Sequence, residues 1–371
     1  MSEFQASNFK KENGGTPDLL GKTELTSPYF FVPPSGTTAE RPESCAAGTL
    51  RFNTDIGSLE VYRGDTIGWE QIQRRESQYL GTGTSSGNGN RGLFYAGQTP
   101  SEVDTIDFIT IPTLGNATDF GNATDTRDEV NCCASRTRGV GGGGYDGGTD
   151  DKIDFVTFSS TGNATDFGNL SVGRFSAAGM GDNVRGIFSG GATPTYQDVI
   201  DYITIAQSGN AVDFGNLTAA TYQPAACSST TRGVIGGGSN PSVTNTIQFV
   251  TIRTTGNSTD FGDLTVARRS LSSSSNATRG IFYAGDSPGN TIEFINLASI
   301  GDAIDFGDLT YGTQEGAACA SSTRGIFGGG NPNVNTINFI EIATTGNASD
   351  FGDLTQARKR LGGCSNGHGG L

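Results

Sequence analysis

The sequence predicts an all-β protein: a six-bladed β-propeller over residues 91–371, preceded by a small β-hairpin module and an extended N-terminal arm. Two markers repeat along the chain in steps of 47 or 45 residues. An Arg-Gly pair opens each repeat at Arg91, Arg138, Arg185, Arg232, Arg279 and Arg324. An Asp-Phe-Gly triplet recurs at Asp119, Asp166, Asp213, Asp260, Asp305 and Asp350. A period of about 40 to 50 residues is typical of propeller blades with four strands each.

Each repeat contains four segments suited to short strands. In the repeat that starts at Arg232, an apolar segment runs into the glycine cluster 236–238, which predicts a strand and a tight turn. Residues 246–252 are rich in β-branched and aromatic side chains, as strands are. A Thr-Gly-Asn turn then leads to the Asp-Phe-Gly segment, and a Ser-rich segment completes the repeat. No repeat contains 12 residues of helical periodicity, so a sheet array is expected.

The fourth segment of each repeat favours a ring over an open stack. It is dominated by Gly and Ser, as expected of strands crowded around an axis, and a ring also protects the strand edges. Residues 358–366 form one more such segment, with no repeat after them. We predict that this segment pairs with Leu93–Tyr95 and closes the ring. Residues 81–90 occupy the same phase and are the competing closing strand, although their composition is that of a flexible linker.

The repeats resemble two known classes of protein. Their Arg-Gly start and glycine-rich strand are similar to kelch-type propeller repeats, although the later Tyr and Trp of kelch are missing. Three sequence segments between Thr323 and Asn366 resemble repeats of virion structural proteins from tailed bacteriophages that infect marine cyanobacteria. The segments are TRGIFGGG, TTGNASDFGDLT and ARKRLGGCSN. Such proteins are usually labelled tail-fibre-like. The resemblance implies a virion location after synthesis in the host cytoplasm.

The N-terminal quarter of the chain differs from the repeats in composition and pattern. Residues 1–26 are polar and read as an extended attachment arm, 27–75 as a hairpin module, and 76–90 as a Gly/Ser linker. Strands are expected at Gly48–Phe52, at Leu59–Tyr62 and around Trp69. This stretch resembles a short β-module of phage fibre and appendage proteins, which implies anchoring to other virion proteins. A module this small needs a packing partner, so a homo-oligomer is expected, with a trimer favoured by the resemblance.

The composition and net charge of the chain argue against several classes of partner. The net charge is −14 with no basic stripe, so neither nucleic acid nor an anionic membrane is an expected partner. No secretory signal and no run of about 18 apolar residues is present, so no membrane segment is expected. Cys133, Cys227, Cys319 and Cys364 share one repeat phase. Equivalent points of different blades lie too far apart for disulfides, which predicts small buried hydrophobic residues.

The repeated Arg and Asp residues admit three interpretations. The Arg that starts each repeat either pairs with the repeated Asp, within or between blades, or donates to loop carbonyls. Both of these roles are structural, and we favour them. The third interpretation is a ring of arginines at a channel mouth that binds an anion.

Enzymatic activity is not expected. The single histidine, His368, leaves no Ser-His-Asp triad and no His-rich metal site. The prominent carboxylates recur in every repeat, whereas an active site needs unique ones. No catalytic residue, metal site or cofactor is therefore predicted, and calcium in the Asp/Asn loops is a minor alternative. The candidate binding residues lie in loops that differ between repeats: Tyr145, Asp146, Thr193, Tyr196, Asn240 and Asn245.

Two functional hypotheses remain. In the first, the protein is a virion appendage whose N-terminal part anchors to the virion and whose propeller loops bind a host-surface glycan or protein. In the second, it is a structural head, neck or tail component that never contacts the host. The sequence does not choose between them.

Overall fold

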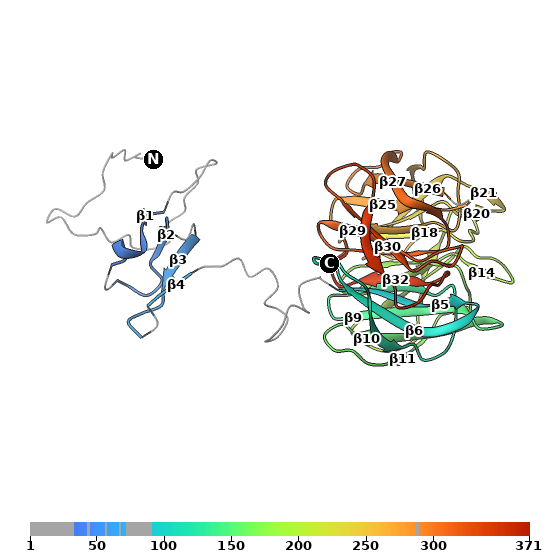
Figure 1. Cartoon of the computed structure of the whole chain (residues 1–371), viewed down its shortest axis with the longest axis horizontal. Coiled ribbons are helices and arrows are strands. Elements are labelled where there is room, and N and C mark those ends of the chain that lie inside the picture. The colour runs from blue at the N-terminus through green and yellow to red at the C-terminus, as the bar shows by residue number, and fades with distance from the viewer. Residues whose placement is uncertain (1–32, 43–44, 56–57, 67, 72–90, 287–288) are drawn as a thin grey trace, which may run out of the picture. The chain divides into compact units, whose positions relative to one another are not determined.

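The protein is seen here in a computed structural model that describes residues 33–42, 45–55, 58–66, 68–71, 91–286 and 289–371. The chain divides into two compact units, Met1–Glu76 and Ser77–Leu371 (Figure 1). In its described part the secondary structure is β, apart from one 3-10 turn at Thr38–Glu40. The predicted all-β class is therefore confirmed. The expected arm 1–26, the expected linker 76–90 and the competing closing strand 81–90 lie outside the described residues.

The first unit contains one small sheet of four strands in the order β1-β2-β3-β4. Their bounds are β1 Ser35–Gly36, β2 Leu50–Asn53, β3 Ser58–Tyr62 and β4 Trp69–Gln71. The three expected strands are present, and β1 adds a parallel edge to β2. At its centre Glu60 is fully buried, and it accepts from Arg41 and from Asn53.

The repeats fold into six four-stranded antiparallel sheets within residues 91–286 and 289–371. We number them by their strand order: sheet 1 is β32-β5-β6-β7, sheet 2 β8-β9-β10-β11, sheet 3 β12-β13-β16-β17, sheet 4 β18-β19-β22-β23, sheet 5 β24-β25-β26-β27 and sheet 6 β28-β29-β30-β31. Two small hairpins, β14 Ala192–Thr193 with β15 Thr195–Tyr196 and β20 Ser239–Asn240 with β21 Ser242–Val243, extend loops of sheets 3 and 4.

The first strand of each sheet in this order is its inner strand. The inner strands are β32 Gly362–Ser365, β8 Asn131–Ala134, β12 Ala178–Gly181, β18 Ala225–Ser228, β24 Ser272–Ser275 and β28 Ala317–Ala320. The second strands are β5 Arg91–Thr99, β9 Arg138–Tyr145, β13 Arg185–Ser189, β19 Arg232–Gly236, β25 Arg279–Tyr283 and β29 Arg324–Gly328. Each therefore begins at the repeated Arg.

The third strands are β6 Ser101–Thr110, β10 Thr149–Thr157, β16 Val199–Thr204, β22 Thr246–Thr251, β26 Gly289–Asn296 and β30 Thr336–Glu341. The outer strands are β7 Thr118–Asn122, β11 Thr165–Asn169, β17 Val212–Asn216, β23 Thr259–Asp263, β27 Ile304–Thr313 and β31 Ser349–Asp353. The Asp-Phe-Gly segment therefore forms the outer strand.

The inner strands contact one another in sequence. β8 contacts β12, and the contacts continue through β18, β24 and β28 to β32, which also contacts β8. Their small side chains allow this close approach. A β-carbon on Gly179 would lie 2.2 Å from the carbonyl oxygen of Cys132, and one on Gly363 would lie 2.4 Å from that of Ala318. The interpretation of the Gly- and Ser-rich segment as an inner strand is confirmed.

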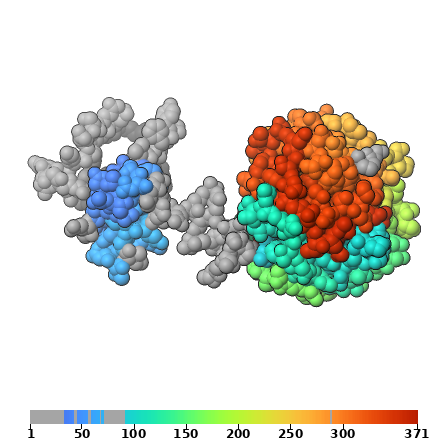
Figure 2. Space-filling view, viewed as in Figure 1, coloured from blue at the N-terminus to red at the C-terminus, as the bar shows by residue number. Residues whose placement is uncertain are grey.

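The last strand of the chain joins the first strand of the repeats, as predicted. β32 is antiparallel to β5 and pairs Gly362 with Tyr95, Gly363 with Phe94 and Cys364 with Leu93. In the space-filling view, the red of the last repeat borders the cyan of the first (Figure 2). Sheet 1 thus contains strands from both ends of the repeat region.

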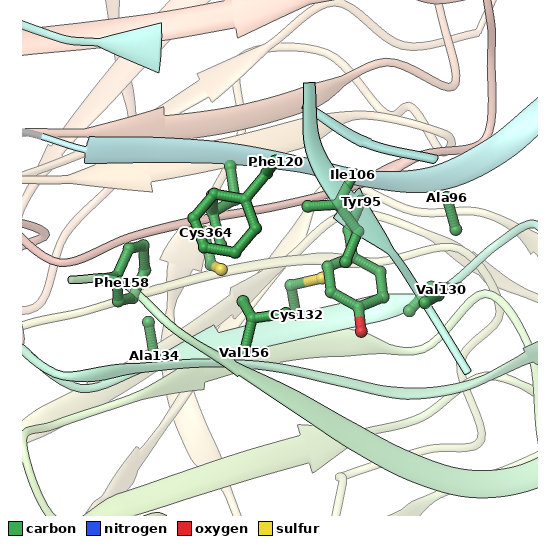
Figure 3. Packing of buried hydrophobic residues seen from close by; sticks show 12 residues of the cluster. Tyr95, Ala96, Ile106, Phe120, Val130, Cys132, Ala134, Val156, Phe158 and Cys364 are labelled. Carbon is green, nitrogen blue, oxygen red and sulfur yellow. The ribbon is translucent and has the colours of Figure 1, made fainter. Parts of the chain in front are cut away.

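Apolar side chains fill the spaces between neighbouring sheets. Between sheets 1 and 2, Tyr95, Phe120, Val130 and Phe158 pack around the two thiols Cys132 and Cys364 (Figure 3). The other sheet pairs have corresponding buried clusters. The Phe of every Asp-Phe-Gly triplet is at most 3 % exposed and therefore belongs to the core. Burial of one such side chain contributes about 1.5 to 3 kcal/mol.

Candidate functional site

The Arg that opens each repeat bridges two neighbouring sheets. Its guanidinium lies 4.2 to 5.0 Å from the centroid of an aromatic ring in its own sheet. Its Nη1 donates to a backbone carbonyl of the next sheet at 2.6 to 3.2 Å. The pairs of Arg and carbonyl residue are Arg91 with Phe158, Arg138 with Ile205, Arg185 with Ile252, Arg232 with Leu297, Arg279 with Ile342 and Arg324 with Ile111. Bonding to carbonyls was one of the structural roles expected. A ring of arginines at a channel mouth was wrong, because these side chains lie between sheets.

The repeated Asp does not join the repeated Arg. Asp119, Asp166, Asp213, Asp260, Asp305 and Asp350 are all exposed on the outer strands. Within the described part of the chain, no ion pair links them to the six arginines. Pairing between the two repeated residues was therefore wrong, since an outer strand directs this carboxylate to solvent.

A second set of arginines, which the sequence analysis did not single out, forms buried ion pairs between sheets. Each lies in the loop after an outer strand and pairs with an acid on the third strand of the next sheet. The pairs are Arg127 with Asp154, Arg174 with Asp201, Arg268 with Glu293 and Arg358 with Asp107. Every member is at most 6 % exposed in its side chain, and the same acid accepts from a Thr or Ser of the loop.

The two remaining sheet junctions carry neutral residues at these positions. Thr221 stands where an Arg would be, with Gln248 in place of the acid, and Thr313 likewise corresponds to Asn338. Gln248 and Asn338 still accept from the loop threonines Thr218 and Thr310. A buried charge is stable only when it is paired, so Arg and acid occur together and are absent together.

The glycine of each Asp-Phe-Gly triplet makes room for the turn of the next sheet. Its φ lies between +143° and +150°. A β-carbon there would lie 2.4 or 2.5 Å from a turn carbonyl oxygen, in the pairs Gly121 with Gly162, Gly168 with Gly209, Gly215 with Gly256, Gly262 with Gly301, Gly307 with Gly346 and Gly352 with Gly115. The Asn or Asp after that turn glycine accepts from the backbone N–H after the triplet at 3.0 or 3.1 Å.

Six residues form a closed ring of backbone hydrogen bonds where the inner strands begin. Each N–H donates to the carbonyl of the preceding member at 2.6 to 3.3 Å, and Glu129, the first, donates to Arg360, the last. The members are Glu129, Ser176, Gln223, Ser270, Glu315 and Arg360. All six have left-handed backbones, with φ between 52° and 60°. We call them the six-residue ring.

The left-handed backbone of the ring is unusual because all six residues carry side chains. A residue other than Gly is uncommon in this conformation, and the strained backbone costs about 1 to 3 kcal/mol. Gly is abundant in the repeats, yet none of the six positions carries it. Strain of this kind clusters at functional sites.

The ring lines a depression of about 430 Å³, which we call the ring pocket. Ser176 donates to Glu129, and Ser270 Oγ donates to Gln223 Oε1 at 2.8 Å. Arg360 Nε lies 3.3 Å from a carboxylate oxygen of Glu315 and 3.3 Å from one of Glu129. Behind the ring, the buried Asp128 lies 3.5 Å from Arg360 Nη1 and has one oxygen without a hydrogen bond. The pocket thus places hydrogen-bonding groups of both kinds around one hollow.

Arg360 lies within ion-pair distance of the three carboxylates of Asp128, Glu129 and Glu315. The pKa values of Asp128 and Glu129 are raised. Burial raises the pKa of Asp128 to about 6, and the charge of Glu129 acts in the same direction. Burial also raises the pKa of Glu129, against the lowering effect of its hydrogen bond from Ser176. The charge of Lys359 lowers the pKa of Glu129, so three carboxyl groups share this region with two basic side chains, Arg360 and Lys359.

None of the six predicted binding residues lines this pocket, although two of them contact chain neighbours of the ring. Tyr145 ends β9, pairs by its backbone with Asp128, and lies with its ring 5.6 Å from Phe175. Tyr196, on β15, stacks at 5.2 Å on Tyr222, whose neighbour Gln223 belongs to the ring. These two tyrosines contact Phe175 and Tyr222, the chain neighbours of the ring members Ser176 and Gln223.

The other four predicted residues lie in the same set of loops, away from the ring. Thr193 lies in the hairpin β14–β15, Asn240 is exposed on β20, and Asp146 is exposed after β9. Asn245 supports the loop, with Nδ2 3.5 Å from the carbonyl of Leu264. The ring itself was not predicted from the sequence, since four kinds of side chain (Glu, Ser, Gln and Arg) at equivalent positions form no motif.

The C-terminal residues lie at the other end of the inner strands. His368 Nε2 is 3.0 Å from the carbonyl oxygen of Ala134, and Gly369 donates to Ser275 at 2.8 Å. His368 borders a cavity of about 370 Å³ lined by the inner strands. The four Cys residues of the shared phase are buried and without disulfides, as expected.

Comparison with known proteins adds no family: no protein-family model matches the chain, and no curated protein is similar to it. In its described part, the structure has no helix long and apolar enough to cross a membrane. The same residues contain no group of three or more His, Cys, Asp or Glu that could hold a metal ion.

Proposed function

We propose that the six sheets form a closed six-bladed propeller of kelch-like type. Three repeated contacts support closure, because each runs from the last sheet to the first as it does between neighbours: Arg324 to Ile111, Arg358 to Asp107, and Gly352 to the turn at Gly115. The pairing of β32 with β5 supplies the fourth. A closed ring also leaves no long unpaired strand edge.

On this scaffold the protein acts as a non-enzymatic recognition protein, and the ring-pocket face is its binding surface. The six-residue ring carries this proposal. Its backbone repeats six times within 8° of φ, whereas its side chains change from Glu to Ser, Gln and Arg. A constant backbone with varied side chains is the arrangement by which repeat scaffolds recognise partners.

The setting we propose is the virion of a tailed bacteriophage, where the chain is a tail-fibre-like appendage. The resemblance of its repeats and of the segment Gly48–Trp69 supports this setting. The N-terminal unit would attach to other virion proteins and hold the chain in a homo-oligomer, with a trimer favoured. The ring-pocket face would then contact a glycan or protein of the host surface.

The test is binding of the fluorescently labelled full chain to marine cyanobacterial cells and to purified phage particles. We expect binding to susceptible cells, and its loss in the double variant Glu129→Ser, Glu315→Ser. Serine is a matched replacement, because Ser176 and Ser270 already occupy the ring. The exposed substitution Asp260→Ala serves as the control and keeps binding. Binding to particles alone would instead support a structural head, neck or tail component.

A further inference from the structure

Four aromatic side chains form a row that reaches the six-residue ring through Phe175 and Tyr222, the chain neighbours of Ser176 and Gln223. Tyr145 contacts Phe175 edge-on at 5.6 Å, Phe175 contacts Tyr222 edge-on at 6.0 Å, and Tyr222 stacks with Tyr196 at 5.2 Å and 14°. None of these four residues is buried, and Tyr145 is 36 % exposed. We call them the aromatic band. Partly exposed aromatic rings in a contiguous row are a feature of binding surfaces.

The band is tied to the pocket by chain position. Phe175 and Tyr222 immediately precede the ring members Ser176 and Gln223. At the equivalent positions of later repeats stand the basic residues Arg269 and Lys359 and the polar residue Gln314. The rim therefore has an aromatic side and a polar side, although the backbone beneath it repeats.

The chemistry of this surface matches a carbohydrate. A sugar ring presents polarised C–H bonds on its faces, which pack against the negative face of an aromatic ring. Its edge presents hydroxyl groups that both donate and accept. Glu129 and Glu315 accept, Arg360 donates, and the amide of Gln223 does both.

The charge of the ring pocket favours uncharged carbohydrates over anionic ones. Glu129, Glu315 and Asp128 lie within hydrogen-bonding or ion-pair distance of the guanidinium of Arg360, and the charge of Lys359 also acts on Glu129, so three acids outnumber two bases. A sugar that carries a carboxylate, sulfate or phosphate would add negative charge to a site that already holds an excess. An uncharged sugar avoids this repulsion.

We propose that the ring pocket and the aromatic band bind an uncharged saccharide chain. One sugar lies in the pocket against the six-residue ring, and the next packs on the face of Tyr196 that does not stack on Tyr222. This inference rests on the proposed recognition function and names its ligand class.

The test is a glycan array probed with the labelled full chain, followed by calorimetric titration with the neutral hits and with an anionic oligogalacturonate. We expect the array to show binding to neutral glycans and calorimetry to show none to oligogalacturonate. Tyr196→Ala, in an exposed hairpin, weakens binding about tenfold, and Glu315→Ser weakens it further. The control Leu114→Ala, an exposed apolar residue in a turn at the opposite end of the strands, leaves affinity unchanged.

Three outcomes overturn the proposal. One is the absence of bound glycan on an array of broad composition. Another is stronger binding to anionic than to neutral glycans. The third is equal affinity of Tyr196→Ala and Leu114→Ala for the hits. Binding of the chain to host cells distinguishes failure of this proposal from failure of the proposed recognition function. If the chain still binds cells in any of these cases, the recognition function is retained and only the ligand class is wrong.

Discussion

Arg358 Nη2 lies 3.1 Å from Asp107 Oδ2, and neither side chain is exposed to solvent. The two residues are 251 positions apart, at opposite ends of the repeat region, yet their contact matches those of Arg174 with Asp201 and Arg268 with Glu293. The junction between the first and last sheets is therefore built like the other junctions.

Breaking this pair should destabilise the fold strongly. In Arg358→Thr, Asp107 remains buried without its partner, and we expect a loss of about 3 to 5 kcal/mol in the free energy of unfolding. The double variant Arg358→Thr, Asp107→Asn reproduces the natural pair Thr313 and Asn338. It should recover most of that loss. Urea unfolding measures both, and a double variant no more stable than the single one would contradict the account.

The repeated Arg should matter for stability and the repeated Asp should not. Arg232 donates to Leu297 at 3.1 Å and lies 5.0 Å from the ring centroid of Phe249. Arg232→Ala removes both contacts and should cost about 1 to 3 kcal/mol. The exposed Asp260→Ala in the same repeat should change stability by less than about 0.5 kcal/mol. Melting temperatures that fall equally in both variants would argue against this assignment.

Acid should stabilise the protein through Asp128. Its folded pKa of about 6 lies above the ordinary value of 3.8, so between these values the folded chain binds more protons than the unfolded one. Stability from this group is therefore lost as pH rises through about 6.

The corresponding measurement compares urea unfolding at pH 5 and pH 7. Asp128→Asn should remove about 1 kcal/mol of the pH dependence, because Arg360 and solvent reduce the full linkage effect. Asp119→Asn, an exposed control, should retain the pH dependence. An unchanged pH dependence in Asp128→Asn would refute the role of Asp128.

The buried thiols should resist alkylation. Burial raises the pKa of Cys227 to about 12, and Cys133 and Cys319 are equally enclosed and shifted upward. With iodoacetamide at pH 8, we expect the partly exposed Cys45 to react first. Peptide mass spectrometry would show the order, and rapid labelling of Cys227 in the folded protein would contradict its burial.

The periodicity of the sequence predicted the strands and the pairing of β32 with β5. All six repeats had to share one alignment, so an error in any one of them would have been visible in the others. Leu93 and Cys364 pair as expected for that reason. The role of the repeated Asp was wrong, because repetition shows that a residue is needed but not which way its side chain points. The buried pair Arg174 and Asp201 was missed, although the exchange of Arg for Thr with acid for amide is visible in the sequence. The six-residue ring was missed because its left-handed backbone has no residue signature apart from Gly.

Closure of the six units is the central claim, and one amide tests it most directly. The N–H of Glu129 donates to the carbonyl of Arg360 at 2.7 Å, across the two ends of the repeat region. The other five ring amides donate to the repeat just before their own. Hydrogen exchange of the full chain, resolved to single residues, should find the Glu129 amide as protected as those of Gln223 and Glu315. Free exchange at Glu129, with the other five ring amides protected, would show that the units are strung in an open line.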